Sequence, residues 1–240
     1  MEKIKRHLLP IVTALSLLLC LAVLDAAENE SRAAFAEAAT QTTVIVDPGH
    51  GGADGGAVSP DGLAEAGVNL DISLRLRDLL RLCGVPVVMT RETDTMLSDA
   101  GCKTISEKKV SDLHHRAELV NAQPDGLLVS IHQNKFEQSK YRGAQVFYAG
   151  TADSDELASA VQESLRLSLD PGNRRACKPS QSVYLMEHIR CTGILVECGF
   201  LSNPDECALL QTPSYQQKLS AAVCGAVTEY LAKRGTEDEI

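Results

Sequence analysis

The sequence lacks tryptophan, and aromatic residues of any kind make up only 4% of its 240 residues. A buried core must therefore be built from Leu, Val, Ile and Ala, and the 44% share of hydrophobic residues is ample for one sizeable domain. Basic residues are also fewer than acidic ones: the sequence has 23 Lys and Arg and 32 Asp and Glu, which gives a formal net charge of −9. Sequence-independent binding to nucleic acid needs a basic footprint, so no nucleic-acid partner is expected.

Paired cysteine motifs are absent as well. None of the eight cysteines forms a CxxC pair, which excludes the usual spacing of a zinc finger. Cys20 lies in the apolar leader, and an odd number remains, several of them in apolar contexts such as "RLCGV" and "AAVCGA". A thiol in such a context acts as a small hydrophobe. We therefore expect buried free thiols rather than a disulfide framework at Cys83, Cys102, Cys177, Cys191, Cys198, Cys207 and Cys224.

The first 26 residues have the layout of a targeting segment. Lys3, Lys5 and Arg6 precede an uncharged run from Leu8 to Leu24, and small residues follow at Ala26 and Ala27. The run is long for a signal peptide and slightly short for a membrane span. We expect residues 1–26 to be a signal peptide or a retained N-terminal anchor with membrane association. The protein is then exported across the cytoplasmic membrane.

The rest of the chain is predicted to hold one domain. Residues 27–41, rich in Ala and Glu, form an expected linker, 42–234 the folded domain and 235–240 an acidic tail. Apolar strands alternate with segments of helical periodicity, which predicts an α/β fold with a mostly parallel or mixed central sheet and helices on both faces. The expected strands are "TTVIVD", "VPVVMTR", "GLLVSIH", "AQVFYAG" and "GILVECGF", and the expected helices span Val68–Leu82, His114–Ala122, Asp155–Leu169, Asp205–Leu210 and Ser214–Ala232.

Four chemically active side chains are predicted to meet at one edge of this sheet. His50 and His132 follow strand ends, and Glu197 lies toward the carboxyl end of an apolar strand. Glu65 follows the glycine-rich stretch "VIVDPGHGGADGG". The carboxyl ends of the strands carry the working site in such sheets. Two histidines and a carboxylate form a ligand set for catalytic zinc, and the glycines around His50 leave room for metal and substrate.

Each of these residues also has a structural interpretation. A strand-end histidine is often hydrogen-bonded scaffolding, and a glycine-rich loop after a strand can cradle phosphate, although this loop lacks the lysine of a P-loop. Burying the carboxylate of Glu197 among apolar neighbours is costly without a partner. That partner could be a metal, in which case Glu197 would either bind the metal or act as a base beside it. Alternatively, the partner could be an arginine such as Arg142 or Arg190.

Six stretches of the chain resemble one known family. They are "VIVDPGHGGADGGA", "GLAEAGVNLDISLRLRDLL", "VVMTRETD", "VSIHQN", "GAQVFY" and "GILVECGFLSNPDE". In order and spacing they resemble the zinc-dependent N-acetylmuramoyl-L-alanine amidases of the type-3 amidase family, from about Thr43 to about Leu231. "SIHQNKF", "YRGAQVFY", "LDPGNRRACK" and "YLMEH" are most similar to the spore-former subgroup named CwlD.

This resemblance implies a function. The family's zinc ligands fall on His50, Glu65 and His132 and its catalytic glutamate on Glu197, although the usual "GLxEK" reads "GLAEA" here. The implied activity removes peptide stems from the muramic acid of peptidoglycan. In the CwlD subgroup it implies cortex maturation during sporulation, toward muramic-δ-lactam and germination. The protein would then lie at the wall or between the spore membranes.

Two other functional classes share parts of this pattern. A wall-binding module that has lost catalysis should lack Glu197 or a ligand, whereas all four residues are present. A zinc peptidase would share the metal chemistry but would cleave within the stem peptide. No separate wall-binding repeat occurs in the chain. Targeting would then depend on the catalytic groove or on an activating partner protein that the sequence does not identify.

Overall fold

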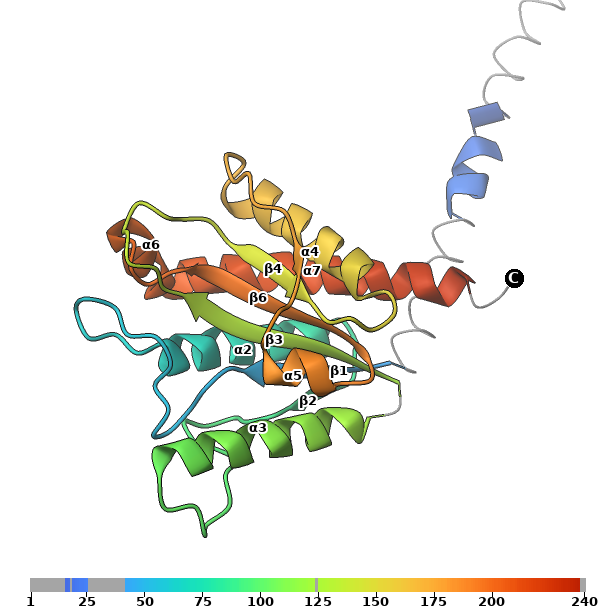
Figure 1. Ribbon diagram of the computed structural model, residues 1–240. Helices are drawn as coiled ribbons and strands as arrows, with labels where there is room; N and C mark the ends of the chain where they lie inside the picture. Colours follow the sequence, from blue (N-terminus) through green and yellow to red (C-terminus); the bar gives the residue numbers. More distant parts are fainter. Residues whose placement is uncertain (1–15, 18, 26–41, 124, 238–240) are drawn as a thin grey trace, which may run out of the picture.

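A six-stranded mixed sheet forms the centre of the computed structural model, which describes residues 16–17, 19–25, 42–123 and 125–237 (Figure 1). The strand order is β2-β1-β3-β6-β4-β5. All neighbouring strands pair in parallel except β4 and β6, which are antiparallel. The strands are β1 (Thr43–Pro48), β2 (Val87–Met89), β3 (Gly126–Asn134), β4 (Gln145–Tyr148), β5 (Lys178–Pro179) and β6 (Thr192–Phe200).

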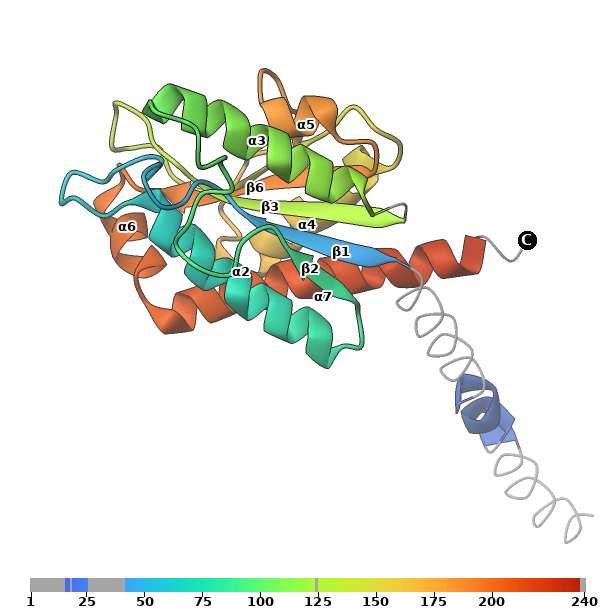
Figure 2. The ribbon, with the colours of Figure 1, turned by 90° about the horizontal axis from the view of Figure 1, so that it is seen from below.

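Helices cover both faces of this sheet, as the sequence predicts (Figure 2). The long helices α2 (Glu65–Leu82), α4 (Ser154–Leu169) and α7 (Pro213–Glu237) pack on one face with the short α6 (Pro204–Leu210). Helices α3 (Ile105–Asn121) and α5 (Tyr184–His188) pack on the other face.

The strands are apolar on both sides because both sides are covered. Successive side chains of a strand point to opposite faces, so Val44 and Val46 of β1 lie in the α2/α7 core and Ile45 in the α3/α5 core. Leu128 and Leu195 lie in the α3/α5 core, which places Ser130, His132 and Glu197 on that same face. The carboxyl ends of the parallel strands β1, β3 and β6 lie together, and we call this end of the sheet its carboxyl edge.

Several predicted elements differ in extent from the observed ones. Helix α3 begins at Ile105, nine residues before the predicted start at His114. The sequence prediction also lacks β5 and α5, which are two and five residues long. Such short elements show no periodicity. Helix α7 continues to Glu237, past the predicted domain boundary at residue 234.

The described part of the leader, residues 16–17 and 19–25, is helical and exposed. Among the described residues, no helix combines the length and apolarity that a membrane crossing requires. The remainder of the predicted leader, the linker over 27–41 and residues 238–240 of the predicted acidic tail lie outside the described residues.

All cysteines within the described residues are free thiols. Burial is confirmed for Cys198, Cys207 and Cys224. The prediction is wrong for Cys83, which is exposed because it forms the C-cap of α2, where that helix leaves the core. The remaining three, Cys102, Cys177 and Cys191, are half-buried.

Candidate metal centre

His50, Glu65 and His132 come together at the carboxyl edge of the sheet. One ligand atom from each of them lies within 4.8 Å of the others. His50 Nε2 lies 3.5 Å and His132 Nδ1 lies 2.9 Å from the two carboxylate oxygens of Glu65. The two imidazole rings meet edge to face, with centroids 5.1 Å apart. Two imidazoles and one carboxylate around a common point fit a catalytic zinc ion with an open position.

Two glycines make this convergence possible. A Cβ on Gly49 would lie 2.2 Å from the His132 ring, and a Cβ on Gly56 would lie 2.6 Å from Glu65 Oε2. Any side chain there would displace one of the candidate ligands. His50 itself has a left-handed backbone, with φ of 61°, which turns the chain sharply after β1. These close approaches explain why the imidazole of His50 is set among glycines.

Glu65 is held as a carboxylate at the first residue of α2. Its Oε1 accepts hydrogen bonds from the backbone N–H of Gln133 at 3.0 Å and from Asn69 Nδ2 at 3.2 Å. Its Oε2 accepts from the N–H of Ala57 at 2.7 Å. Burial alone would raise the pKa of Glu65, but the hydrogen bond and charge of His132 outweigh it and lower the pKa to about 2. The carboxylate is thus ready to bind a cation at neutral pH.

Glu197 faces the same edge from the neighbouring strand, where it is the register partner of His132. Its Oε2 is shielded from solvent and has no hydrogen-bond partner among the described residues. Burial raises the pKa of Glu197 to about 7, although the charge of His132 opposes the shift. Neither Arg142 nor Arg190 pairs with it: Arg142 contacts Asp170, 3.7 Å away. An unpartnered buried oxygen beside two ligands suits a proton carrier better than a structural ion pair.

Asp54 contacts the ring nitrogen of His50 that faces away from Glu65, and Lys109 in turn contacts Asp54. His50 Nδ1 and Asp54 Oδ2 are 2.7 Å apart, so Nε2 is the nitrogen left to face Glu65. Lys109 Nζ, from α3, lies 2.7 Å from the other oxygen of Asp54. Neither Asp54 nor Lys109 is among the site residues predicted from the sequence.

The role of Asp47 is structural. It is buried and accepts hydrogen bonds from Arg116, from Thr90 Oγ1 at 2.6 Å and from Ser130 Oγ at 2.6 Å. The Arg116 guanidinium also donates to the carbonyl oxygens of Pro48 and His50, at 2.9 and 2.7 Å. Asp47 and Arg116 therefore fix the backbone that carries His50.

Arg91 holds the same loop in place. It is buried, and it donates hydrogen bonds to the carbonyl oxygens of Pro48, Gly49, Ala66 and Thr93. These bonds tie the loop after β1 to the start of α2. The other histidines among the described residues stand apart from the metal centre. His188 is exposed and stacks on Tyr184, His114 is exposed and lies at a tilt to the same ring, and His115 bonds the carbonyl of Ser111.

Two cavities open on the α3/α5 face next to the ligands. One of about 290 Å³ is lined by His50, His132, Asp54 and Lys109. The other, of about 350 Å³, is lined by Glu197 and Lys178. Both are bordered by Val183 and Leu195. One cavity thus reaches the two histidines and the other reaches Glu197, and the two adjoin at Val183 and Leu195.

Known proteins resemble this chain in sequence and fold. The family of N-acetylmuramoyl-L-alanine amidases known as type-3 amidases matches residues 44–229. A germination-specific N-acetylmuramoyl-L-alanine amidase of Bacillus subtilis is 41% identical over 197 residues, 82% of each chain. The solved CwlD amidase of Clostridioides difficile, in complex with the GerS lipoprotein, is 42% identical with a TM-score of 0.77, covering 79% of this chain and 98% of that one.

A more distant solved relative has the same activity in its name. The N-acetylmuramoyl-L-alanine amidase of Clostridium difficile 630 is 30% identical with a TM-score of 0.69, over 79% of this chain and 96% of that chain. The family match spans all four predicted site residues and nearly the whole folded domain. The chain therefore belongs to the type-3 family of N-acetylmuramoyl-L-alanine amidases and is an enzyme of that class.

Proposed function

We propose that this amidase is a zinc enzyme of the spore cortex, exported to hydrolyse the bond between N-acetylmuramic acid and L-alanine. The observation that carries the zinc assignment is the convergence of one carboxylate and two imidazoles within 4.8 Å, beside the unpartnered oxygen of Glu197. The proposed zinc ligands are His50, Glu65 and His132, and Glu197 is the proposed acid–base residue.

The reaction divides between metal and chain. Zinc at such a site polarises an amide carbonyl and makes water nucleophilic at neutral pH. Glu197 accepts a proton from the attacking water and donates it to the leaving nitrogen of L-alanine. A carboxyl group whose pKa burial raises to about 7 suits both transfers near neutral pH. Asp54 keeps His50 in one tautomer through its contact with Nδ1.

Mass spectrometry of digested peptidoglycan tests the reaction itself. An amidase releases whole peptide stems and leaves glycan strands with free muramic acid carboxylates. A zinc peptidase would instead release amino acids or peptides by cleaving within the stem, and a wall-binding module would release nothing. Products of either of these two kinds would overturn the proposal.

Metal analysis tests the zinc assignment separately. We expect about one zinc ion per chain, removable by a chelator, with activity restored when zinc is added. His132→Ala should abolish tight binding, because two remaining ligands do not complete the site. Purified protein that holds no zinc and is not activated by it would contradict the assignment.

The cortex role is supported by the germination-specific name of the Bacillus subtilis relative. Expression in a sporulating host that lacks its own cortex amidase should restore muramic-δ-lactam to the cortex. The His132→Ala variant serves as the control. Normal vegetative wall turnover without δ-lactam would place the enzyme elsewhere.

Export and a protein partner complete the proposal. Fusing residues 1–41 to a reporter that works only outside the cytoplasm should give an active reporter, and an inactive, cytosolic fusion would refute export. A lipoprotein binds the solved CwlD relative. We infer a comparable activating partner for this chain, to be sought by crosslinking during sporulation and identified by its effect on zinc affinity.

A further inference from the structure

A cluster of positive charge lies at the carboxyl edge of the sheet in a chain that is otherwise acidic. Residues 135–142 and 170–178 hold six Lys and Arg against two acidic residues, whereas the whole chain has a net charge of −9. We call these six residues the basic face: Lys135, Lys140, Arg142, Arg174, Arg175 and Lys178.

The two segments of the basic face lie against each other. Arg175 Nε donates a hydrogen bond to the carbonyl of Arg142 at 2.9 Å, and its guanidinium stacks on Phe200, 4.7 Å from the ring centroid. Asn173 Nδ2 bonds the carbonyl of Ala144 at 2.8 Å. The two segments are thus held side by side at the end of the sheet, with Lys178 toward the α3/α5 face and Arg174 toward α4.

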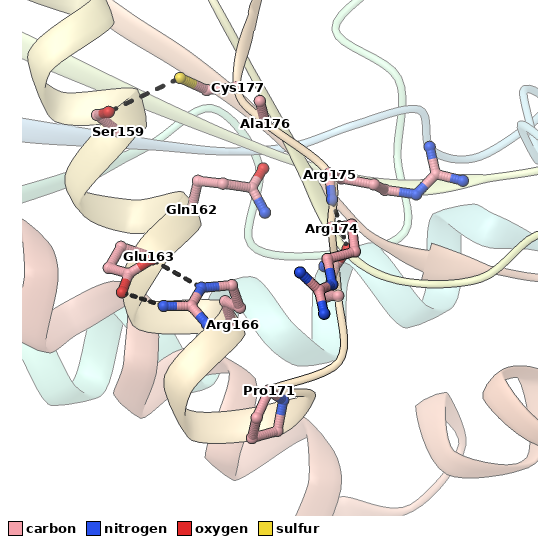
Figure 3. Close-up of a pocket in the computed structure, with 10 residues that line it drawn as sticks. Ser159, Gln162, Glu163, Arg166, Pro171, Arg174, Arg175, Ala176 and Cys177 are labelled. Atoms are coloured by element: carbon pink, nitrogen blue, oxygen red, sulfur yellow. Dashed lines mark hydrogen bonds and ion pairs between the residues drawn. The ribbon is translucent and has the colours of Figure 1, made fainter.

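Much of this charge has no partner within the protein. Arg174 is exposed and forms no hydrogen bond or ion pair with any described residue. Figure 3 shows it extending toward α4, across a cavity of about 640 Å³, whereas Arg166 on that helix is neutralised by Glu163. Lys135 and Lys178 are likewise exposed and unpaired among the described residues.

An aromatic pair accompanies the cations. Phe136 is 50% and Tyr141 36% exposed, in a chain with only 4% aromatic residues. Their rings meet edge to face with centroids 4.8 Å apart, and Lys140 Nζ lies 5.5 Å from the Tyr141 centroid. Exposed aromatic faces next to cations can pack against the C–H faces of sugar rings while the charges meet carboxylates.

The basic face is continuous with the catalytic edge. Lys178 lines the same cavity as Glu197. Phe136 follows His132 by four residues, so it lies within about 14 Å of that ligand along the chain. A substrate strand that places its amide at Glu197 must continue past these residues on at least one side.

We infer that the basic face binds the carboxylates of a peptidoglycan strand next to the bond being cleaved. The inference rests on peptidoglycan being the substrate. Each stem peptide ends in a carboxylate, and each hydrolysed amide leaves a new carboxylate on muramic acid. The strand is therefore a polyanion whose charge on the glycan grows as the enzyme works. The basic face would retain the enzyme on the strand through these charges.

Co-sedimentation of the full-length protein with insoluble peptidoglycan tests this inference. Chelator is included so that no bond is cleaved during the measurement. The variant is Lys140→Glu with Arg174→Glu, and the matched control is Lys103→Glu with Lys218→Glu, which makes the same charge change at exposed positions outside the basic face. We expect binding about fivefold weaker for the variant at low ionic strength, and unchanged for the control. The difference should shrink at high salt because screening shortens the reach of exposed charges.

Four further arms identify what is bound. Glycan stripped of its stems should bind through the muramic acid carboxylates, and released stems should compete only if peptide carboxylates contribute. When the carboxylates of peptidoglycan are converted to neutral amides, the variant and the control should bind it equally. Vesicles of phosphatidylglycerol test a membrane surface as the alternative ligand.

The outcomes separate this inference from the proposed function. A variant that sediments like the control, equal binding to neutralised peptidoglycan, or a stronger effect of the variant on vesicles than on peptidoglycan would each overturn the basic face as a strand-binding surface. Hydrolysis of a small soluble muramoyl peptide should be the same in variant, control and wild type. Failure of the wild type to hydrolyse it would count against the proposed function alone.

Discussion

The most informative single residue is Glu197, because it differs from a buried glutamate, Glu206, at the same end of the sheet. Both oxygens of Glu206 accept backbone hydrogen bonds at 2.9 Å, from Gly143 and Phe200. Glu197 Oε2 has no such partner among the described residues. Burial raises the pKa of both. Glu206 therefore holds loops together, whereas Glu197 keeps an oxygen available for chemistry.

Replacing Glu197 by Gln should therefore separate chemistry from folding. Turnover should fall by about 100- to 10,000-fold, the usual contribution of a positioned acid–base group. Zinc content should stay near that of the wild type, because the three ligands remain. The measurement is specific activity per bound zinc, together with the melting temperature. Glu206→Gln is the contrasting variant, and it should lower the melting temperature but not the activity of the folded enzyme. A zinc-loaded Glu197→Gln enzyme with near-normal activity would show that another residue moves the proton.

Asp54 offers a test of how the ligands are oriented. A carboxylate on the outer nitrogen of a ligating histidine fixes its tautomer, and removing such a group costs about 10- to 100-fold in metal affinity. We expect Asp54→Asn to weaken zinc binding within that range, measured by competition with a chromophoric chelator. Asp61→Asn, an exposed change in the same loop, is the matched control. Equal zinc affinities for the two variants would refute a supporting role for Asp54.

The sequence was sufficient to bring the candidate ligands to one place but not to find the residues that hold them there. His50, His132 and Glu197 could be placed because each lies at or near a strand end, and parallel strands bring their ends to one edge. Lys109 reaches Asp54 only because α3 packs across the face of the sheet, a long-range contact that no local pattern encodes. Arg116 gave no signal either, since a buried arginine between two aspartates looks like any charged residue of a helix.

At the scale of elements, the start of α3 is marked by a capping motif that the apolar periodicity does not reveal. The helix starts at Ile105, where Thr104 and Glu107 form a capping box: Glu107 N–H donates to Thr104 Oγ1, and Thr104 N–H donates to the Glu107 carboxylate, both at 3.2 Å. The spacing Thr-x-x-Glu is readable in the sequence. The apolar pattern of α3 is weak over its first half, which includes exposed Ile105 and Val110. The helix was therefore predicted to start too late.

Removing this cap should destabilise the protein modestly. Thr104→Ala leaves the N–H of Glu107 without its side-chain acceptor, and loss of such a cap costs about 0.5–2 kcal/mol. The free energy of unfolding, measured in urea, should fall by that amount. Thr104→Ser keeps the hydroxyl and should retain most of the stability. If the alanine and serine variants unfold at the same urea concentration, the capping box contributes nothing measurable.

At the scale of the whole molecule, the sequence predicted the layers and left the order of the strands open. Alternation of apolar strands with helices was enough for an α/β fold with both faces covered. The antiparallel pairing of β4 with β6 depends on how the chain crosses between them, and strand orientation leaves no mark in apolar periodicity. The two-residue β5 exists only because it pairs with β4 at the edge of the sheet.

One buried ion pair joins these layers and predicts how the protein responds to acid. Arg116 of α3 meets Asp47 of β1, and each side chain is 2% exposed. Burial alone would raise the pKa of Asp47, but the charge of Arg116 and the hydroxyl donors Ser130 and Thr90 lower it to about 2. An unfolded aspartate titrates near pH 4. The folded carboxylate therefore contributes stability that is present above pH 4 and is lost as the pH falls from about 4 to about 2.

Asp47→Asn should remove this contribution at every pH. At pH 7 the free energy of unfolding should fall by about 3 kcal/mol, because the buried charge of Arg116 loses one of its two carboxylate partners. Below pH 4 the wild type should lose stability more steeply than the variant, so their unfolding free energies should converge toward pH 2. Urea unfolding at pH 7, 4 and 3 measures this, with the exposed Asp61→Asn as the control for a lost surface charge. A constant gap between wild type and Asp47→Asn across these pH values would mean that other carboxylates govern acid unfolding.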